Sequence, residues 1–242
     1  MATPEENRAN LMANRKKIYA LEKGVMENKK NAYLNRSMSM VNRQMIMRNR
    51  EAAFGGNRQL ANYNTDMLFS NRKGILGALP DDTAVQKNFK DCMLNKVKLE
   101  FLEHRSELNT EVMDINKDIQ AVNESMMAVN KRIMALNEEI VNFNAKKIAE
   151  NKEWLDSGVP GAGNPTPDGN AAIIAANAAK IAEVEARMNK NAGTTAANRE
   201  SLLERRAKIE KNTEDIYQRR ERIEENAANI KANADRISAL FA

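Results

Sequence analysis

The chain has 242 residues, of which 42% are hydrophobic, 29% charged and only 5% aromatic, and its formal net charge is +5. So few aromatic side chains leave little bulk for a compact globular core, whereas abundant Asn, Met, Lys, Arg and Glu suit long helices. A single Cys excludes a disulfide scaffold, and a single His argues against a histidine-based metal site or catalytic triad.

The first helix is expected over about residues 4–79, because apolar side chains recur along it at helical spacing. Gly55-Gly56 lies where the repeat carries one extra residue, which predicts a kink, a π-bulge or a short break there. The turn chemistry of Leu79 to Thr83 should end this helix and cap the next one.

A second helix is expected over about 82–157, followed by a Pro- and Gly-rich linker at 158–168 and a third helix over about 169–241. Three segments of nearly equal length are what an up-down-up bundle requires. The predicted fold is therefore all-α: one elongated three-helix coiled-coil bundle over residues 1–242, with the kink near Gly55-Gly56.

Asparagine recurs every seven residues along nearly the whole chain. Twenty-five of the 32 Asn fall on this spacing, in three phases that match the three helices. Seven residues is the coiled-coil repeat, so each helix should present one row of amides beside its apolar stripe. The asparagines that we take as a structural ladder are Asn14, Asn28, Asn35, Asn42, Asn49, Asn109, Asn116, Asn123, Asn130, Asn137, Asn144, Asn212, Asn226 and Asn233.

Such a ladder has two physical uses and one trivial explanation. Amides from adjacent helices could form hydrogen-bonded layers inside the bundle, or they could line outer seams and join neighbouring molecules into a fibre. A buried amide without a hydrogen bond costs about 1–3 kcal/mol, so either use demands partners. The trivial explanation is a solvated flank, but solvent imposes no seven-residue spacing.

Charge is distributed unevenly among the helices. Residues 1–79 hold 14 basic and 6 acidic side chains, whereas residues 80–157 hold 11 basic and 15 acidic ones. This difference favours pairing of the first two helices, although exposed ion pairs contribute only about 0–1 kcal/mol each. A basic row follows the asparagines of the first helix at Arg8, Arg15, Arg36, Arg43, Arg50, Arg58 and Arg72.

The segment from Ile209 to Ile216 reads Ile-Glu-Lys-Asn-Thr-Glu-Asp-Ile. It resembles the Ile-x-x-Asn-Thr-x-x-Ile motif of trimeric autotransporter adhesin stalks, and the resemblance covers mainly residues 198–240. In that family the asparagines point inward and coordinate anions along a trimer axis, so the resemblance implies inward Asn layers here. The overall pattern also looks like that of coiled-coil filament proteins and of extrusome matrix proteins of the trichocyst type.

These patterns favour a structural protein over a binding module or an enzyme. We expect a coiled-coil rod that self-assembles into a filament or decorates one, with itself or related coiled-coil proteins as partners. The alternative is a module whose basic first helix docks on an acidic filament, a membrane surface or nucleic acid. Nucleic acid is the less favoured of these, because the row has few interleaved aromatic side chains.

No catalytic constellation stands out, so we expect neither an enzyme nor a cofactor, metal or small-molecule substrate. No apolar run reaches the 18 residues that a membrane span needs, and the N-terminus lacks the apolar stretch of a secretory signal. The expected location is cytoplasmic, or a storage organelle or secreted fibre if a leader is removed before Met1.

Overall fold

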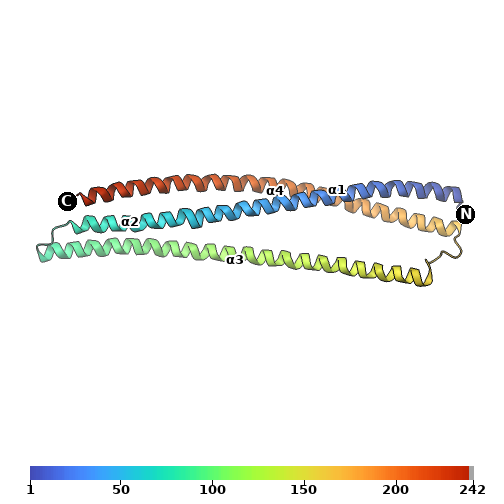
Figure 1. The fold of residues 1–242 in the computed structure, drawn as a ribbon, viewed down its shortest axis with the longest axis horizontal. Coiled ribbons are helices and arrows are strands. Elements are labelled where there is room, and N and C mark those ends of the chain that lie inside the picture. Colours follow the sequence, from blue (N-terminus) through green and yellow to red (C-terminus); the bar gives the residue numbers. More distant parts are fainter. Residues whose placement is uncertain (240–242) are drawn as a thin grey trace. The chain divides into compact units, whose positions relative to one another are not determined.

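The computed structural model describes residues 1–239 and is 92% helical, with no strand in that range. Its elements in chain order are α1 (Pro4–Arg50), a π-helix η1 (Glu51–Asn57), α2 (Arg58–Gly77), α3 (Ala84–Ser157) and α4 (Pro167–Ser238) (Figure 1). The predicted all-α helical bundle is thereby confirmed.

Short polar motifs cap the starts of α1 and α3. Before α3, the Thr83 backbone N–H donates to Gln86 Oε1 at 3.0 Å, and the Gln86 N–H donates back to Thr83 Oγ1 at 3.2 Å. Thr3 and Glu6 form the same reciprocal pair at the start of α1. Each pair satisfies two N–H groups that the first helical turn leaves without partners.

Three helix boundaries differ by two residues from the predicted ones: α2 ends at Gly77 and not at 79, α3 begins at Ala84 and not at 82, and α4 begins at Pro167 and not at 169. Gly158 follows α3 with φ of +81°, a conformation that glycine adopts without strain, so the helix ends at Ser157. Helix α4 begins at Pro167, two residues earlier than predicted, because proline suits the first helical position and Thr166 caps the Gly169 N–H. The predicted end of this helix at 241 lies outside the described residues.

The interruption expected at Gly55-Gly56 is the π-helix η1 and not a break. The backbone remains helical through η1, and its neighbours Arg50 and Arg58 both have right-handed helical dihedrals. A π-helix accommodates one more residue than an α-helix over the same rise. The extra residue between Asn49 and Asn57 is therefore absorbed within a continuous helical path.

The structure divides into two compact units. The first comprises Met1–Met45 together with Asn137–Ile209, and the second comprises Ile46–Leu136 together with residues 210–239. The expectation of one bundle over the whole chain stays a prediction.

In the second unit, α2 and α3 form an antiparallel hairpin. Phe69 and Phe101 stack with ring centroids 5.0 Å apart, Arg72 pairs with Glu100 at 3.5 Å, and Asp66 pairs with Arg105. Later residues of α2 thus meet earlier residues of α3. Val97 of α3 is the most deeply buried apolar residue of this hairpin, at 2% exposed.

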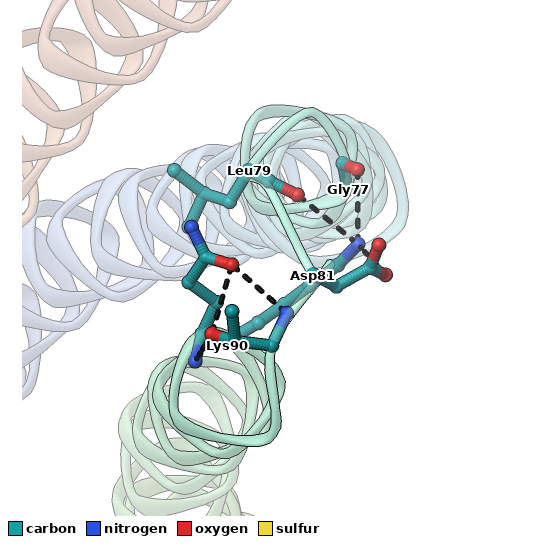
Figure 2. Close-up of polar contacts among 6 residues, drawn as sticks. Gly77, Leu79, Asp81 and Lys90 are labelled. Carbon is teal, nitrogen blue, oxygen red and sulfur yellow. Dashed lines mark hydrogen bonds and ion pairs between the residues drawn. The ribbon is translucent and has the colours of Figure 1, made fainter.

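Lys90 closes the turn between these two helices (Figure 2). Its ammonium donates to the carbonyl oxygens of Gly77 at 3.1 Å and Leu79 at 3.5 Å, and it pairs with Asp81 at 3.0 Å. The last carbonyls of a helix have no partner within the helix and carry partial negative charge. One lysine therefore holds both the end of α2 and the loop that follows it.

Packing of α3 stops well before the helix ends. Its apolar side chains Leu94, Phe101 and Leu108 are partly covered, but beyond them most of its apolar residues are exposed. Val122, for example, is 59% exposed, and Leu136 is 56% exposed. The apolar stripe of this helix, which a fully packed three-helix bundle would bury, is thus uncovered over its later part in this chain.

Candidate functional site

The most regular feature of the first unit is a series of hydrogen bonds between α1 and α4. Asparagine Nδ2 groups of α1 donate to backbone carbonyl oxygens of α4 at 2.8–2.9 Å. Donor and acceptor are always 160 residues apart, so the two helices run parallel here. The pairs are Asn7–Pro167, Asn14–Ile174, Asn28–Met188, Asn35–Thr195 and Asn42–Leu202.

The second unit repeats the arrangement between η1–α2 and α4. Asn57 donates to the carbonyl of Ile216, Asn64 to that of Ile223 and Asn71 to that of Ile230, at 2.8–2.9 Å. The separation is now 159 residues. We call the donors of both units, with their carbonyl acceptors, the asparagine ladder.

The one-residue difference between 160 and 159 is explained by the π-helix. Donors on both sides of η1 recur every seven residues, as do the acceptors on α4, but Asn49 and Asn57 are eight apart. Because η1 takes up the extra residue, donors after it meet carbonyls in the same phase as donors before it. The π-helix therefore keeps the ladder in register.

Each rung, by which we mean one donor–acceptor pair of the ladder, uses a backbone carbonyl oxygen whose hydrogen-bonding capacity is only half used within the α-helix. A carbonyl oxygen has two lone pairs, and the helix engages only one of them. An intramolecular hydrogen bond of this type stabilises a fold by about 0.5–1.5 kcal/mol. The residue that supplies the carbonyl is usually apolar, so Ile230, for example, also buries its side chain and is 6% exposed.

The amides are deeply buried, but some of their oxygen atoms have no hydrogen-bond partner. Asn35 is 9% exposed and Asn42 is 5% exposed, and the Oδ1 atoms of both are buried without a hydrogen-bond partner. Leaving such an acceptor unsatisfied costs about 1–3 kcal/mol. These rungs therefore contribute less net stability than their donor bonds alone would give, which favours a role in fixing register and direction.

Two positions vary the pattern. Leu21 replaces the amide where Asn would be expected, and Ile181 of α4 is buried to 6% exposure in the same unit. Gly24 allows the Met188 side chain to approach closely, because a Cβ at this position would overlap the Met188 sulfur atom. Between the amide rungs, α1 and α4 thus contact each other through apolar side chains and through the close approach at Gly24.

The asparagines predicted as a structural ladder lie in three rows, on α1, α3 and α4, and these rows have different surroundings. The row on α1 contacts α4, and Thr213 Oγ1 of α4 donates to Asn49 Oδ1 at 2.9 Å in the second unit. The rows on α3 and α4 are exposed. Those exposed members are Asn109, Asn116, Asn123, Asn130, Asn137 and Asn144 on α3, and Asn212, Asn226 and Asn233 on α4.

The contacts also differ in kind from the interlocking amide layers considered above. In the part of the chain that the structure describes, the rungs join an amide to a backbone carbonyl and not to a second amide. Asn7, Asn57, Asn64 and Asn71 are rungs that were counted in the repeat but left out of the candidate set. Their seven-residue spacing was the signal that could have included them.

The basic row lies on the surface beside the ladder. Some members are engaged: Arg15 hydrogen-bonds to the Tyr19 hydroxyl, Arg58 lies 4.7 Å from the Phe54 ring centre, and Arg72 pairs with Glu100. Arg8, Arg36, Arg43 and Arg50 are exposed.

Comparison with known proteins gives no family, because no family model, curated protein or solved structure matches this chain. Among residues 1–239, no helix has an apolar stretch long enough to cross a bilayer. In the same range, no three metal-binding side chains gather into a possible site.

Proposed function

We propose that this protein is a structural coiled-coil rod that self-assembles into a filament or decorates one. The observation that supports this most strongly is the asparagine ladder, in which one interaction is repeated at seven-residue intervals in both units. A repeat of this kind specifies direction and register between helices, as polar residues at coiled-coil positions do. Direction and register are the properties that a building block of an ordered array needs.

The uncovered part of α3 supports the same proposal. It leaves a row of amides and a broad apolar surface exposed in a single chain, including Ile115, Val129 and Ile133, which are 44–53% exposed. Large exposed apolar patches mark interaction sites in soluble proteins. Assembly would cover this surface.

The test is to image the purified full chain by negative-stain electron microscopy over a range of salt concentrations, with light scattering in parallel. We expect ordered filaments or sheets, with an axial repeat near the length of a 74-residue helix, about 110 Å. A monodisperse particle under every condition would contradict self-assembly.

The alternative function is docking of the basic row on an acidic surface. Exposure of Arg36 and Arg43, which have no carboxylate partner among the described residues, favours it. The double variant Arg36→Glu/Arg43→Glu separates the two functions, because it should abolish docking on acidic vesicles or polyanions but leave self-assembly unchanged. The matched control is Lys16→Glu/Lys17→Glu, which makes the same charge change on the same helix outside this row.

A further inference from the structure

We infer that α3 pairs in parallel and in register with α3 of a second copy of this chain, through an asparagine ladder of its own. The inference deepens the proposed function and rests on it. It concerns the α3 face, by which we mean the exposed surface of α3 between Asn109 and Leu136. The whole of this segment lies within the second unit.

Asn130 of the α3 face has the same kind of surroundings as an amide that already forms a rung, and Asn116 and Asn123 each have three apolar neighbours together with Gln120. The four nearest positions on a helix face lie three and four residues away on either side. Around the rung residue Asn64 these are Leu60, Ala61, Met67 and Leu68. Around Asn130 they are Met126, Met127, Ile133 and Met134, which are also all apolar.

The exposed amides of α4 have different surroundings, which argues against the same use. Asn226 has Arg222 and Asn229 on one side, and on its other side Ile223 and Ile230 already pack against α2. Water can satisfy an amide in that setting without exposing new apolar surface. The mainly apolar setting of Asn116, Asn123 and Asn130 is therefore what distinguishes them from the α4 amides.

The direction in which helices must run to form such a ladder identifies the partner of α3. A helical side chain leans toward the N-terminus of its helix, whereas backbone carbonyls point toward the C-terminus. An amide and a carbonyl from two helices therefore point toward one another when the helices are parallel, as they do in the pair Asn64–Ile223. Because α3 runs antiparallel to α2, and α4 runs parallel to α2, the described residues of the second unit supply no parallel helix for α3.

The α3 helix of a second copy can lie parallel to the first, and its backbone carbonyls can act as the acceptors. On α4, every acceptor in the second unit lies three residues before a repeat position, as Ile223 does before Asn226. The equivalent carbonyls on α3 belong to Met113, Gln120 and Met127, which lie three residues before Asn116, Asn123 and Asn130.

The side chains of the α3 face suit such a pair. Met113 is 63% exposed, Met127 is 57% exposed and Met134 is 69% exposed, so the acceptor row is open. The segment spans four heptads, the length over which a coiled-coil pattern becomes specific. With three basic and four acidic side chains between Asn109 and Leu136, two copies would not repel each other strongly.

The test uses single cysteines in the full chain, with the native exposed thiol removed by Cys92→Ser. Met113→Cys and Met134→Cys report on the two ends of the α3 face, and Asp118→Cys, on the opposite side of the helix, is the matched control. Parallel pairing in register brings equal residues together. We therefore expect Met113→Cys and Met134→Cys each to form disulfide-linked homodimers several-fold faster than Asp118→Cys.

Mixing the two probe variants tests direction. An antiparallel pair centred on Asn123 would join Met113→Cys to Met134→Cys in preference to either homodimer, and this result would overturn the inference. Equal crosslinking of all three variants, or none, would overturn it as well. The double variant Met126→Lys/Ile133→Lys should abolish dimers in sedimentation equilibrium, whereas Asp118→Lys should not, provided that circular dichroism shows both to be helical.

The outcomes separate this inference from the proposed function. Filaments that form without crosslinks at the α3 face would leave the proposed function standing and make the inference wrong. A crosslinked, discrete α3 dimer that never extends would support the inference and contradict the filament.

Discussion

The Nδ2 group of Asn42 donates a 2.9 Å hydrogen bond to the backbone carbonyl oxygen of Leu202, which lies 160 residues further along the chain. Rungs after the π-helix span 159 residues, as in the pair Asn71–Ile230. The same interaction is thus preserved on both sides of a one-residue insertion. The π-helix is best understood as the device that keeps the amides in phase with α4.

Because the π-helix serves to keep the amides in phase, we expect Gly55 to be dispensable. Its deletion leaves Asn49 and the next rung donor seven residues apart, so η1 can become a regular α-helix and the ladder stays in phase. We expect the Tm to remain within a few degrees of the unmodified protein, or to rise, when it is followed by circular dichroism.

The matched control is deletion of Met40, an exposed residue between Asn35 and Asn42. That deletion shifts every earlier donor by one residue relative to the later ones, and it should lower the Tm markedly. If the Gly55 deletion proves as damaging as the Met40 deletion, the π-helix has some role other than phase correction.

A single rung has a measurable effect on stability. Asn64→Ala removes a buried donor, and we expect the free energy of unfolding to fall by about 1 kcal/mol in urea denaturation. Asn62→Ala, two residues away on the exposed side of α2, should change it by less than about 0.5 kcal/mol. Equal effects of the two substitutions would mean that the rung bond contributes nothing to stability.

The turn between α2 and α3 depends on Lys90. Lys90→Met keeps most of the side-chain volume but removes the donor to Gly77, Leu79 and Asp81, and we expect a loss of about 1–2 kcal/mol. Lys87→Met, on an exposed face of the same helix, is the control and should be nearly neutral. A loss of the same size at Lys87 would show that the general charge of α3, and not the contact at the turn, matters.

The amides of the α3 face should specify register more than affinity. The triple variant Asn116→Leu/Asn123→Leu/Asn130→Leu replaces three amides of the face with apolar side chains, so we expect tighter association in sedimentation equilibrium. Register should be lost at the same time, so that Met113→Cys and Met134→Cys in this background crosslink to each other as well as to themselves. Weaker association in the triple variant would mean that the amide bonds dominate affinity.

The sequence predicts the elements well because their signals are local. Thr83 and Gln86 form a capping pair that can be recognised from four consecutive residues, and the extra residue near Gly55 is visible as a slip in the repeat. Helix period and turn chemistry are set by near neighbours along the chain. Those features are therefore accessible without a structure.

The partner of each amide cannot be predicted from local sequence signals of this kind. Asn64 and Asn123 occupy equivalent positions in the repeat, yet Asn64 is 8% exposed and bonded to Ile223, whereas Asn123 is exposed. The difference depends on which helix lies alongside, and in which direction. The acceptor is a backbone carbonyl, which every residue has, so no side chain marks it in the sequence.

The most direct measurement of the ladder is hydrogen exchange of the side-chain amides in protein labelled with ¹⁵N only at asparagine. At a concentration where the chain is monomeric, we expect slow exchange at Asn57, Asn64 and Asn71, and fast exchange at Asn123 and Asn226. Uniformly fast exchange of all the amides would contradict the ladder.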